Sequence, residues 1–196
     1  MATLPYRAAE ARPMDYACVR PLFGGRMTQA QVDGCEAVLA ATLGLPVAYQ
    51  AYLLATTLHE TARTMQPIAE RGARGYFERY EPVTVIGRQL GNTQPGDGWA
   101  YRGRGYVQIT GRANYARAGG FLKVDLVGFP DRALEPDIAA WILVSGCVKG
   151  WFTGRRLSDY LDGPQSDYVG ARRVVNGTDR AVQIAAYAAT FAEALA

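Results

Sequence analysis

Hydrophobic residues recur at helical spacing after position 28, which predicts two consecutive helices in the first third of the chain. Thr28 and Gln31 resemble a capping box, a pattern with which helices often begin. The hydrophobic stripe that follows consists of Val32, Cys35, Leu39 and Leu43, and Gly44 is a suitable end for this helix. A second helix is predicted over residues 46–60, opened by a proline and ended by His59 and Glu60.

The last third of the chain shows helical periodicity again. Pro136 suits the first turn of a helix whose apolar residues 138–148 should be buried. Shorter helices are predicted at 157–161 and at 168–175, the second ended by Asn176 and Gly177. Asp179 is predicted to cap a final helix, whose stripe is Ile184, Ala188, Phe191 and Leu195.

Residues 62–105 form a different region, with eight glycines, three prolines and weak periodicity. Long irregular segments inside a compact domain are usually functional. After this region, residues 106–110 alternate and predict a short strand, and a further helix begins at 111. Residues 1–26 are predicted to be an irregular lead-in with short helical pieces at most. We therefore expect one mainly α-helical domain over residues 1–196, with little β-structure and a long glycine-rich loop region.

Composition and charge narrow the class of protein. Hydrophobic residues make up 49% and charged residues 20% of the chain, which is typical of globular proteins. The net charge of +3 is small for a dedicated nucleic-acid binder. No apolar run approaches the ~18 residues of a membrane span, and charged residues lie where a signal peptide would have its apolar segment. We expect synthesis in the cytoplasm, no nucleic-acid partner and no stable membrane insertion.

The cysteines and the histidine exclude further classes. The three cysteines, Cys18, Cys35 and Cys147, are odd in number and form no CxxC motif, which argues against a disulfide framework and a zinc cage. His59 is the only histidine, so a Ser-His-Asp hydrolase would depend on it alone. We expect neither a metal nor a cofactor.

Glu60 is the first candidate for acid/base chemistry because it ends an apolar helix at the border of the irregular region. A half-buried carboxyl has a raised pKa, as a general acid requires. The alternative is a structural glutamate that caps the helix or pairs with Arg63. A second carboxylate is needed, and Glu70, Glu78 and Glu81 follow in the irregular region; each could equally be a surface charge.

The glycine-rich region supplies candidate binding residues. Glycines in Gly91-Asn-Thr-Gln-Pro-Gly-Asp-Gly98 and in Tyr101-Arg-Gly-Arg-Gly-Tyr106 allow a ligand to approach the backbone. Neither a P-loop nor a GxGxxG motif occurs. Arg102 and Arg104 are candidates to pair with carboxylates or to hold substrate. On the predicted strand, Gln108 and Thr110 would share one side, and with Asn114 they form a polar wall that could bind a water and a sugar, or only cap the local backbone.

Four segments together resemble glycoside hydrolase family 19, which holds plant and bacterial chitinases and bacteriophage endolysins. The segments are His59-Glu-Thr-Ala with Met65-Gln-Pro, Leu90-Gly-Asn-Thr-Gln-Pro-Gly-Asp-Gly98, Tyr101-Arg-Gly-Arg-Gly-Tyr-Val-Gln-Ile-Thr-Gly-Arg-Ala-Asn-Tyr115 and Arg172-Arg-Val-Val-Asn-Gly-Thr-Asp179. The resemblance covers roughly residues 45–195. It implies a single catalytic domain with a lysozyme-like, two-lobed helical fold and a central cleft, and metal-free, inverting hydrolysis of β-1,4 links beside N-acetylated sugars.

The resemblance also implies roles for individual residues. Glu60 matches the family's general acid, and Thr110 matches the hydroxyl that helps to hold the attacking water. Gln108, Asn114 and Asn176 match sugar-binding positions. The complete set of candidate substrate contacts is His59, Tyr101, Arg102, Arg104, Gln108, Asn114, Tyr115 and Asn176.

The second acid lies at different spacings within the family. In compact bacterial and phage forms it follows the first by nine or ten residues, which favours Glu70 as general base; the plant spacing points near Glu81, and Glu78 lies between them. An inverting mechanism requires the two carboxyl groups to lie roughly 6.5–9.5 Å apart. Plant forms also have an arginine in the final helix that orders the carboxylates, but Gln183 stands in that region here, so this role is not transferred.

Three hypotheses about function follow. The first is a phage or prophage endolysin that cleaves peptidoglycan as a monomer, is made without a signal peptide and reaches the cell wall with the help of a holin-type membrane-pore protein. The second is a chitinase acting on N-acetylglucosamine polymers. The third is a non-catalytic glycan-binding protein of the same fold.

Overall fold

The computed structural model describes residues 13–164 and 166–196. The described chain forms two compact units: residues 67–142 build one, and residues 13–66 together with 143–196 build the other. Of the predicted lead-in, residues 1–12 lie outside the described residues. The remainder contains the short helix α1 (Tyr16–Val19) and the 3₁₀ helix η1 (Arg20–Phe23). Each unit is described by itself.

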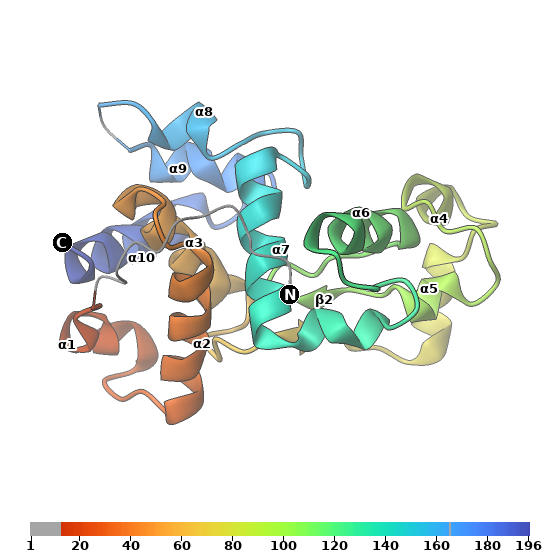
Figure 1. Ribbon diagram of the computed structural model, residues 1–196, viewed down its shortest axis with the longest axis horizontal. Helices are drawn as coiled ribbons and strands as arrows, with labels where there is room; N and C mark the ends of the chain where they lie inside the picture. The colour runs from red at the N-terminus through yellow and green to blue at the C-terminus, as the bar shows by residue number, and fades with distance from the viewer. Residues whose placement is uncertain (1–12, 165) are drawn as a thin grey trace. The chain divides into compact units, whose positions relative to one another are not determined.

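The unit of residues 13–66 and 143–196 is built around helix α3 (Val47–Glu60), which begins directly after Pro46 as predicted. All ten residues from Tyr49 to Leu58 except Gln50 are buried, because α3 is apolar or small around most of its circumference. Helices α2 (Gln29–Ala41) and α10 (Ala181–Ala194) pack against it (Figure 1). The last turn of α3 therefore belongs to a helix that is packed against its neighbours.

The ends of these helices show which local patterns were correct. Thr28 and Gln31 form the predicted capping box at the start of α2. The predicted stripe of α10, from Ile184 to Leu195, is buried. The predicted cap by Asp179 is wrong: the residue before α10 is Arg180, in the left-handed region at φ 56°, and no side chain caps the helix.

Shorter helices complete this unit. They are the last two turns of α7 (Pro136–Lys149), α8 (Ser158–Leu161), α9 (Tyr168–Ala171) and the 3₁₀ helix η4 (Arg172–Val174). The hydroxyl of Tyr52, on α3, donates a hydrogen bond to the carbonyl of Ala171 at 2.9 Å. Helix α9 also packs against α10. Because η4 directly follows α9 in the chain, its start is held by helices that pack around α3.

The unit of residues 67–142 contains the glycine-rich region. Its elements are β1 (Ile68–Ala69), η2 (Arg74–Tyr80), α4 (Val85–Gln89), α5 (Asp97–Ala100), β2 (Arg104–Gly105), α6 (Arg112–Leu122), η3 (Pro130–Leu134) and the first turns of α7. Strands β1 and β2 pair antiparallel, with Ile68 opposite Gly105. The region that appeared irregular in sequence is therefore a series of short elements.

The strand predicted over residues 106–110 is wrong. The strand β2 ends at Gly105, and the chain turns back so that Arg104 forms a bridge with Ile109. Gly105 and Gln108 have left-handed φ values of 85° and 53°, which interrupt the extended backbone that strand alternation requires. Gln108 and Thr110 are therefore residues of a tight turn and its exit.

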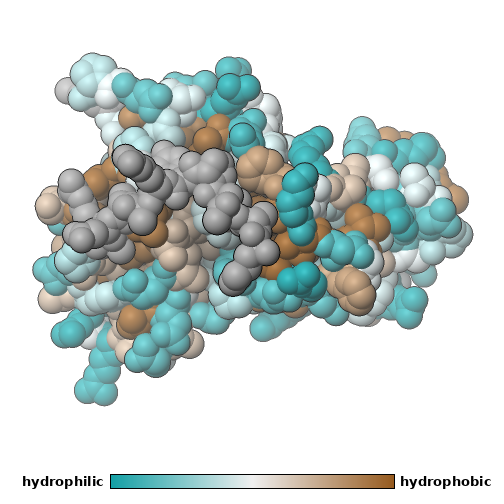
Figure 2. Space-filling view, viewed as in Figure 1, coloured by the Kyte–Doolittle hydropathy of each residue, from teal (hydrophilic) through white to brown (hydrophobic). Residues whose placement is uncertain are grey.

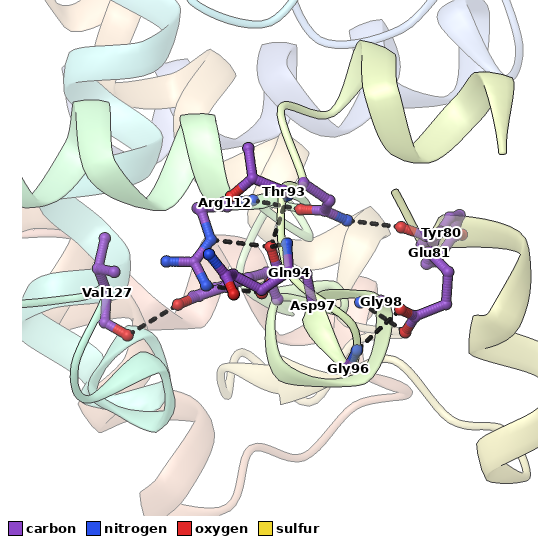
Figure 3. A network of polar contacts seen from close by, with 11 residues as sticks. Tyr80, Glu81, Thr93, Gln94, Gly96, Asp97, Gly98, Arg112 and Val127 are labelled. Carbon is purple, nitrogen blue, oxygen red and sulfur yellow. Dashed lines mark hydrogen bonds and ion pairs between the residues drawn. The ribbon is translucent and has the colours of Figure 1, made fainter. Parts of the chain in front are cut away.

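A buried polar network orders the loops around α5 (Figure 3). Asp97 is 3% exposed, pairs with Arg112 at 2.7 Å and accepts hydrogen bonds from the backbone N–H groups of Thr93 and Gln94. Burial alone would raise the pKa of Asp97, but the hydrogen bonds from Arg112 and from the backbone outweigh it, so the pKa lies below its usual value. The network fixes the segment Gly91–Gly98 in one conformation.

The surface carries both polar and apolar residues. On the face shown in Figure 2, hydrophilic residues alternate with smaller hydrophobic patches. None of the helices in the described part of the chain has the length and apolar character needed to cross a membrane.

Candidate active site

Glu60 lies at the end of α3, where the packed helix gives way to a turn. Its side chain is 23% exposed, and its Oε1 accepts a hydrogen bond from Nη1 of Arg172 at 2.6 Å. Arg172 is only 2% exposed, and its Nε donates to the carbonyl of Asp179 at 3.0 Å. A planar guanidinium held at two points fixes the carboxyl group in one orientation. The structural alternative of a pair with Arg63 is not what is seen, because the partner is Arg172.

Arg172 is the residue that sequence reasoning missed. It stands first in the Arg172-Arg-Val-Val-Asn-Gly string that carried part of the resemblance, so a signal for it was present. On the final helix, where the plant forms have a carboxylate-ordering arginine, Gln183 stands instead and the role was not transferred. The structure places an arginine of this kind in η4 instead, 112 positions from Glu60 in sequence.

Glu70, a candidate base in the unit of residues 67–142, accepts a hydrogen bond on each of its two carboxylate oxygens. Its Oε1 accepts from the hydroxyl of Tyr80 at 3.0 Å, and its Oε2 accepts from the backbone N–H of Gly103 at 3.0 Å. Burial, and then the hydrogen bond to Glu70, raise the pKa of Tyr80 to about 12, so the phenol remains a donor. A Cβ atom at Gly103 would lie 2.8 Å from Oε1 of Gln108 and 3.2 Å from Oε2 of Glu70, which explains why a glycine stands there.

The other two carboxylates have different surroundings. Oε2 of Glu81 accepts from the backbone N–H of Gly96 at 2.8 Å, and Oε1 accepts from Gly98 at 3.1 Å (Figure 3). Both oxygens therefore support the loop at the start of α5. Glu78 is exposed on η2. The choice of Glu70 over Glu81 and Glu78 as the second carboxylate stays a prediction.

Gln108, Thr110 and Asn114 form a chain of local hydrogen bonds after β2. The side-chain amide of Gln108 donates to the carbonyl of Ile68 at 2.8 Å. The hydroxyl of Thr110 donates to the carbonyl of Gln108 at 2.9 Å, and Asn114 donates to the carbonyl of Thr110 at 2.8 Å. All three are half-buried. The local capping considered from the sequence is present, and the acceptor lone pairs of the Thr110 hydroxyl are not used by these bonds.

Three buried side chains support the turn after β2, those of Tyr101, Arg104 and Tyr115. Tyr101 is 4%, Arg104 2% and Tyr115 0% exposed. Arg104 pairs with Asp131 at 2.7 Å and also donates to the hydroxyl of Tyr115 at 3.0 Å. Their burial corrects the expectation of direct sugar contact at these three positions, because buried side chains that are already hydrogen-bonded present no surface to a substrate.

The remaining candidates are accessible. The guanidinium of Arg102 lies 4.1 Å from the centre of the Trp99 ring, and burial and the charge of Arg104 lower its pKa. His59 is half-buried and lines a pocket in the unit that holds Glu60. Asn176 is exposed, and its Oδ1 accepts from the N–H of Gly177. These three positions stay predictions for substrate binding.

Within residues 13–164 and 166–196, no three His, Cys, Asp or Glu side chains lie in a group that could hold a metal ion.

Comparison with known proteins supports the resemblance in sequence. No family model matches the chain. A glycosyl hydrolase family 19 domain-containing protein of Haemophilus influenzae is 53% identical over 48 residues, which are 22% of this chain and 24% of that protein. The chain thus matches about a quarter of the length of this curated relative.

Comparison of structures supports the fold. Chitinase C from Streptomyces griseus superposes with a TM-score of 0.66 at 19% identity, covering 97% of this chain and 79% of that one. A bacterial family 19 chitinase superposes with a TM-score of 0.55 at 20% identity, covering 93% and 94% of the two chains. The predicted mainly helical, lysozyme-like fold and the resemblance to glycoside hydrolase family 19 are confirmed.

Proposed function

We propose that this chain is a family 19 glycosidase that hydrolyses β-1,4 links of peptidoglycan by an inverting acid/base mechanism. The observation that carries the proposal is the carboxyl group of Glu60, which ends a buried helix and is oriented by the buried guanidinium of Arg172. In a fold shared with family 19 chitinases, this oriented carboxyl group is the one to which we assign proton transfer to a bound sugar.

In the proposed reaction, protonated Glu60 donates its proton to the glycosidic oxygen as the bond to the anomeric carbon breaks. Ionised Glu70 takes a proton from the water that attacks this carbon from the opposite face, so the configuration inverts. Tyr80 and Gly103 hold the Glu70 carboxylate through one oxygen each. Because the hydroxyl of Thr110 already donates to a carbonyl, its oxygen remains to accept a hydrogen bond from the water.

The biological role we propose is that of a phage or prophage endolysin. In this role the chain is made in the cytoplasm, acts as a monomer and reaches the cell wall after a holin-type protein has opened the membrane. The role predicts that cells producing the protein remain intact until their membrane is permeabilised, and that their turbidity then falls. Lysis by a Glu60→Gln variant under the same conditions would contradict it.

A chitinase is the second candidate, since the two solved structures compared above, which share the fold, are chitinases. Purified peptidoglycan and a soluble chitin oligomer separate the two. Mass analysis of the peptidoglycan fragments identifies the new reducing-end sugar, and we expect faster release from peptidoglycan than from chitin. The opposite preference would favour the chitinase, and saturable binding without new reducing ends would favour a non-catalytic glycan-binding protein.

A further inference from the structure

A pocket of about 340 Å³ lies beside the end of α3, within the unit that holds Glu60. It is formed by the last turn of α3, the turn that follows it and the first turns of α10. The lining residues are Leu58, His59, Ala62, Arg63, Arg180, Gln183 and Tyr187. None of the reaction steps above uses this pocket.

The pocket is lined by hydrogen-bond donors and positive charge, and none of its lining residues is acidic. The hydroxyl of Tyr187 accepts hydrogen bonds from Nε2 of Gln183 at 2.8 Å and from a guanidinium nitrogen of Arg63 at 3.4 Å. Since its oxygen is used as an acceptor, the hydroxyl proton of Tyr187 is available to a ligand. Together with Arg63 and Arg180, this arrangement suits a carboxylate, which only accepts.

The backbone at both arginines has a left-handed conformation that residues with a Cβ atom rarely adopt. Arg63 has a φ of 68° and Arg180 a φ of 56°, and Ala62 has a φ of 50°. This left-handed region favours glycine, and residues with a Cβ atom persist there where the surrounding structure holds them. The N–H of Arg63 donates to the carbonyl of Leu58 at 2.8 Å, and the side chain of Gln31 donates to the carbonyl of Arg63 at 2.9 Å. Two arginines therefore occupy disfavoured positions around one pocket.

The residues that line the pocket are neighbours in sequence of the groups that hold Glu60. His59 lines the pocket and is followed by Glu60 in the same helical turn. Arg172 binds Glu60 and the carbonyl of Asp179, the residue that precedes Arg180. The pocket and the support of the Glu60 carboxyl group are therefore built from the same two segments of the chain.

We propose that Arg63 and Arg180 bind a carboxylate carried by the glycan substrate. This inference rests on the proposed function and makes it more specific. Chitin is an uncharged polymer, whereas peptidoglycan carries carboxylates on its stem peptides and, where a peptide is absent, on the lactyl group of its muramic acid. Recognition by the two arginines would favour peptidoglycan over chitin, because only peptidoglycan carries a carboxylate. The planar guanidinium of an arginine can pair with this carboxylate through two hydrogen bonds.

The test compares three soluble substrates: glycan strands with stem peptides, the same strands after an amidase has removed the peptides, and a chitin oligomer. The variants are Arg63→Gln, Arg180→Gln and their combination. Arg155→Gln is the matched control, because Arg155 is an exposed arginine of the same unit that does not line the pocket. We expect KM to rise about tenfold per arginine on a carboxylate-bearing substrate, in line with one charge-assisted hydrogen bond, with kcat and the chitin reaction unchanged.

The pattern across substrates identifies the source of the carboxylate. An effect on peptide-bearing strands alone assigns the pocket to the stem peptide, and an effect on amidase-treated strands alone assigns it to the free lactyl carboxylate. An effect on both shows that the pocket accepts either carboxylate. Equal kinetics of the double variant and the Arg155→Gln control on all substrates would overturn the inference. Arg63→Gly and Arg180→Gly guard against misfolding, because glycine suits the backbone at both positions; they should show the same loss with an unchanged or higher thermal midpoint.

Failure of the inference and failure of the proposed function are distinguishable. Binding of a purified disaccharide-tetrapeptide, measured by calorimetry in a Glu60→Gln background, requires no turnover. If wild-type protein cleaves nothing but this probe binds in an arginine-dependent way, the proposed function fails and the pocket assignment stands. If the probe binds equally well without both arginines, the stem-peptide assignment fails whatever the enzyme cleaves. If a peptide-free disaccharide with its free lactyl carboxylate does so too, the whole pocket assignment fails.

Discussion

Replacement of Arg172 by methionine tests how Glu60 is positioned. Methionine keeps much of the buried, unbranched stem but removes the guanidinium. Two bonds are lost: the one to Oε1 of Glu60 at 2.6 Å and the one to the carbonyl of Asp179 at 3.0 Å. Arg172 is 2% exposed, so no water takes its place easily, whereas the 23% exposed Glu60 can regain part of its hydration.

The expected loss of stability follows from these contacts. A hydrogen bond with one charged partner contributes about 1.5–3 kcal/mol. Because Glu60 keeps access to solvent, its share lies near the lower end of this range, and the bond to Asp179 adds a similar amount. We expect Arg172→Met to lower the free energy of unfolding by about 2–4 kcal/mol. The coupling between Arg172 and Glu60 should be about 1–2 kcal/mol.

Urea unfolding followed by circular dichroism measures both quantities when Arg172→Met, Glu60→Gln and the double variant are compared. Turnover of a soluble glycan at saturating concentration measures the positioning effect. We expect kcat to fall about 10²-fold with little change in KM, since a small displacement of a catalytic group costs that much. Arg172→Lys keeps the charge but cannot make both contacts, so it should restore stability more than kcat.

Two results would refute this reasoning. Strictly additive effects of the two single variants would show that Arg172 and Glu60 are not coupled. A kcat of Arg172→Met close to that of wild type, measured well below the unfolding midpoint, would show that the arginine does not position the acid.

Three further predictions concern the unit of residues 67–142. Gly103→Ala should lower kcat and cost about 1–3 kcal/mol of stability, because its Cβ would approach Oε2 of Glu70 to 3.2 Å; a normal melting point with normal kcat would exclude this. Tyr80→Phe should cost about 1 kcal/mol in urea unfolding through the lost bond to Glu70, and no change would contradict it. The pKa of Asp97 is lowered in the folded state, so its stabilisation is full above the unfolded value of 3.8 and is lost as pH falls below it; Asp97→Asn should flatten this acid dependence of unfolding, and an equally steep dependence would refute the assignment.

The helices of the first and last thirds were predictable because their signals are local. The capping box of Thr28 and Gln31 and the proline before Val47 define helix starts from adjacent residues alone. The stripe of α10 repeats at helical spacing and is buried. Such patterns depend on neighbours in sequence, so they indicate the helices correctly without knowledge of the tertiary contacts.

The site was only partly predictable because its contacts join distant segments. Glu60 and Arg172 lie 112 positions apart in sequence, and no local pattern at either residue indicates that the two form a pair. The alternation of residues 106–110 failed because Gln108 adopts a left-handed backbone that no polar–apolar pattern indicates. Arg104 is buried and pairs with Asp131, which lies in the distant element η3, so an arginine that resembled a substrate contact proved to support the turn.

The most direct test of the account is the reaction of Glu60→Gln with a β-1,4-linked glycan, followed by proton magnetic resonance. Wild type should release product with the α configuration first, and Glu60→Gln should lose about 10³-fold in kcat while its free energy of unfolding falls by no more than the about 1–2 kcal/mol of coupling to Arg172. An aryl glycoside whose leaving group needs no proton should recover much of the lost rate. Full activity of Glu60→Gln on the natural linkage, or initial release of the β product, would contradict proton donation by Glu60 in an inverting reaction.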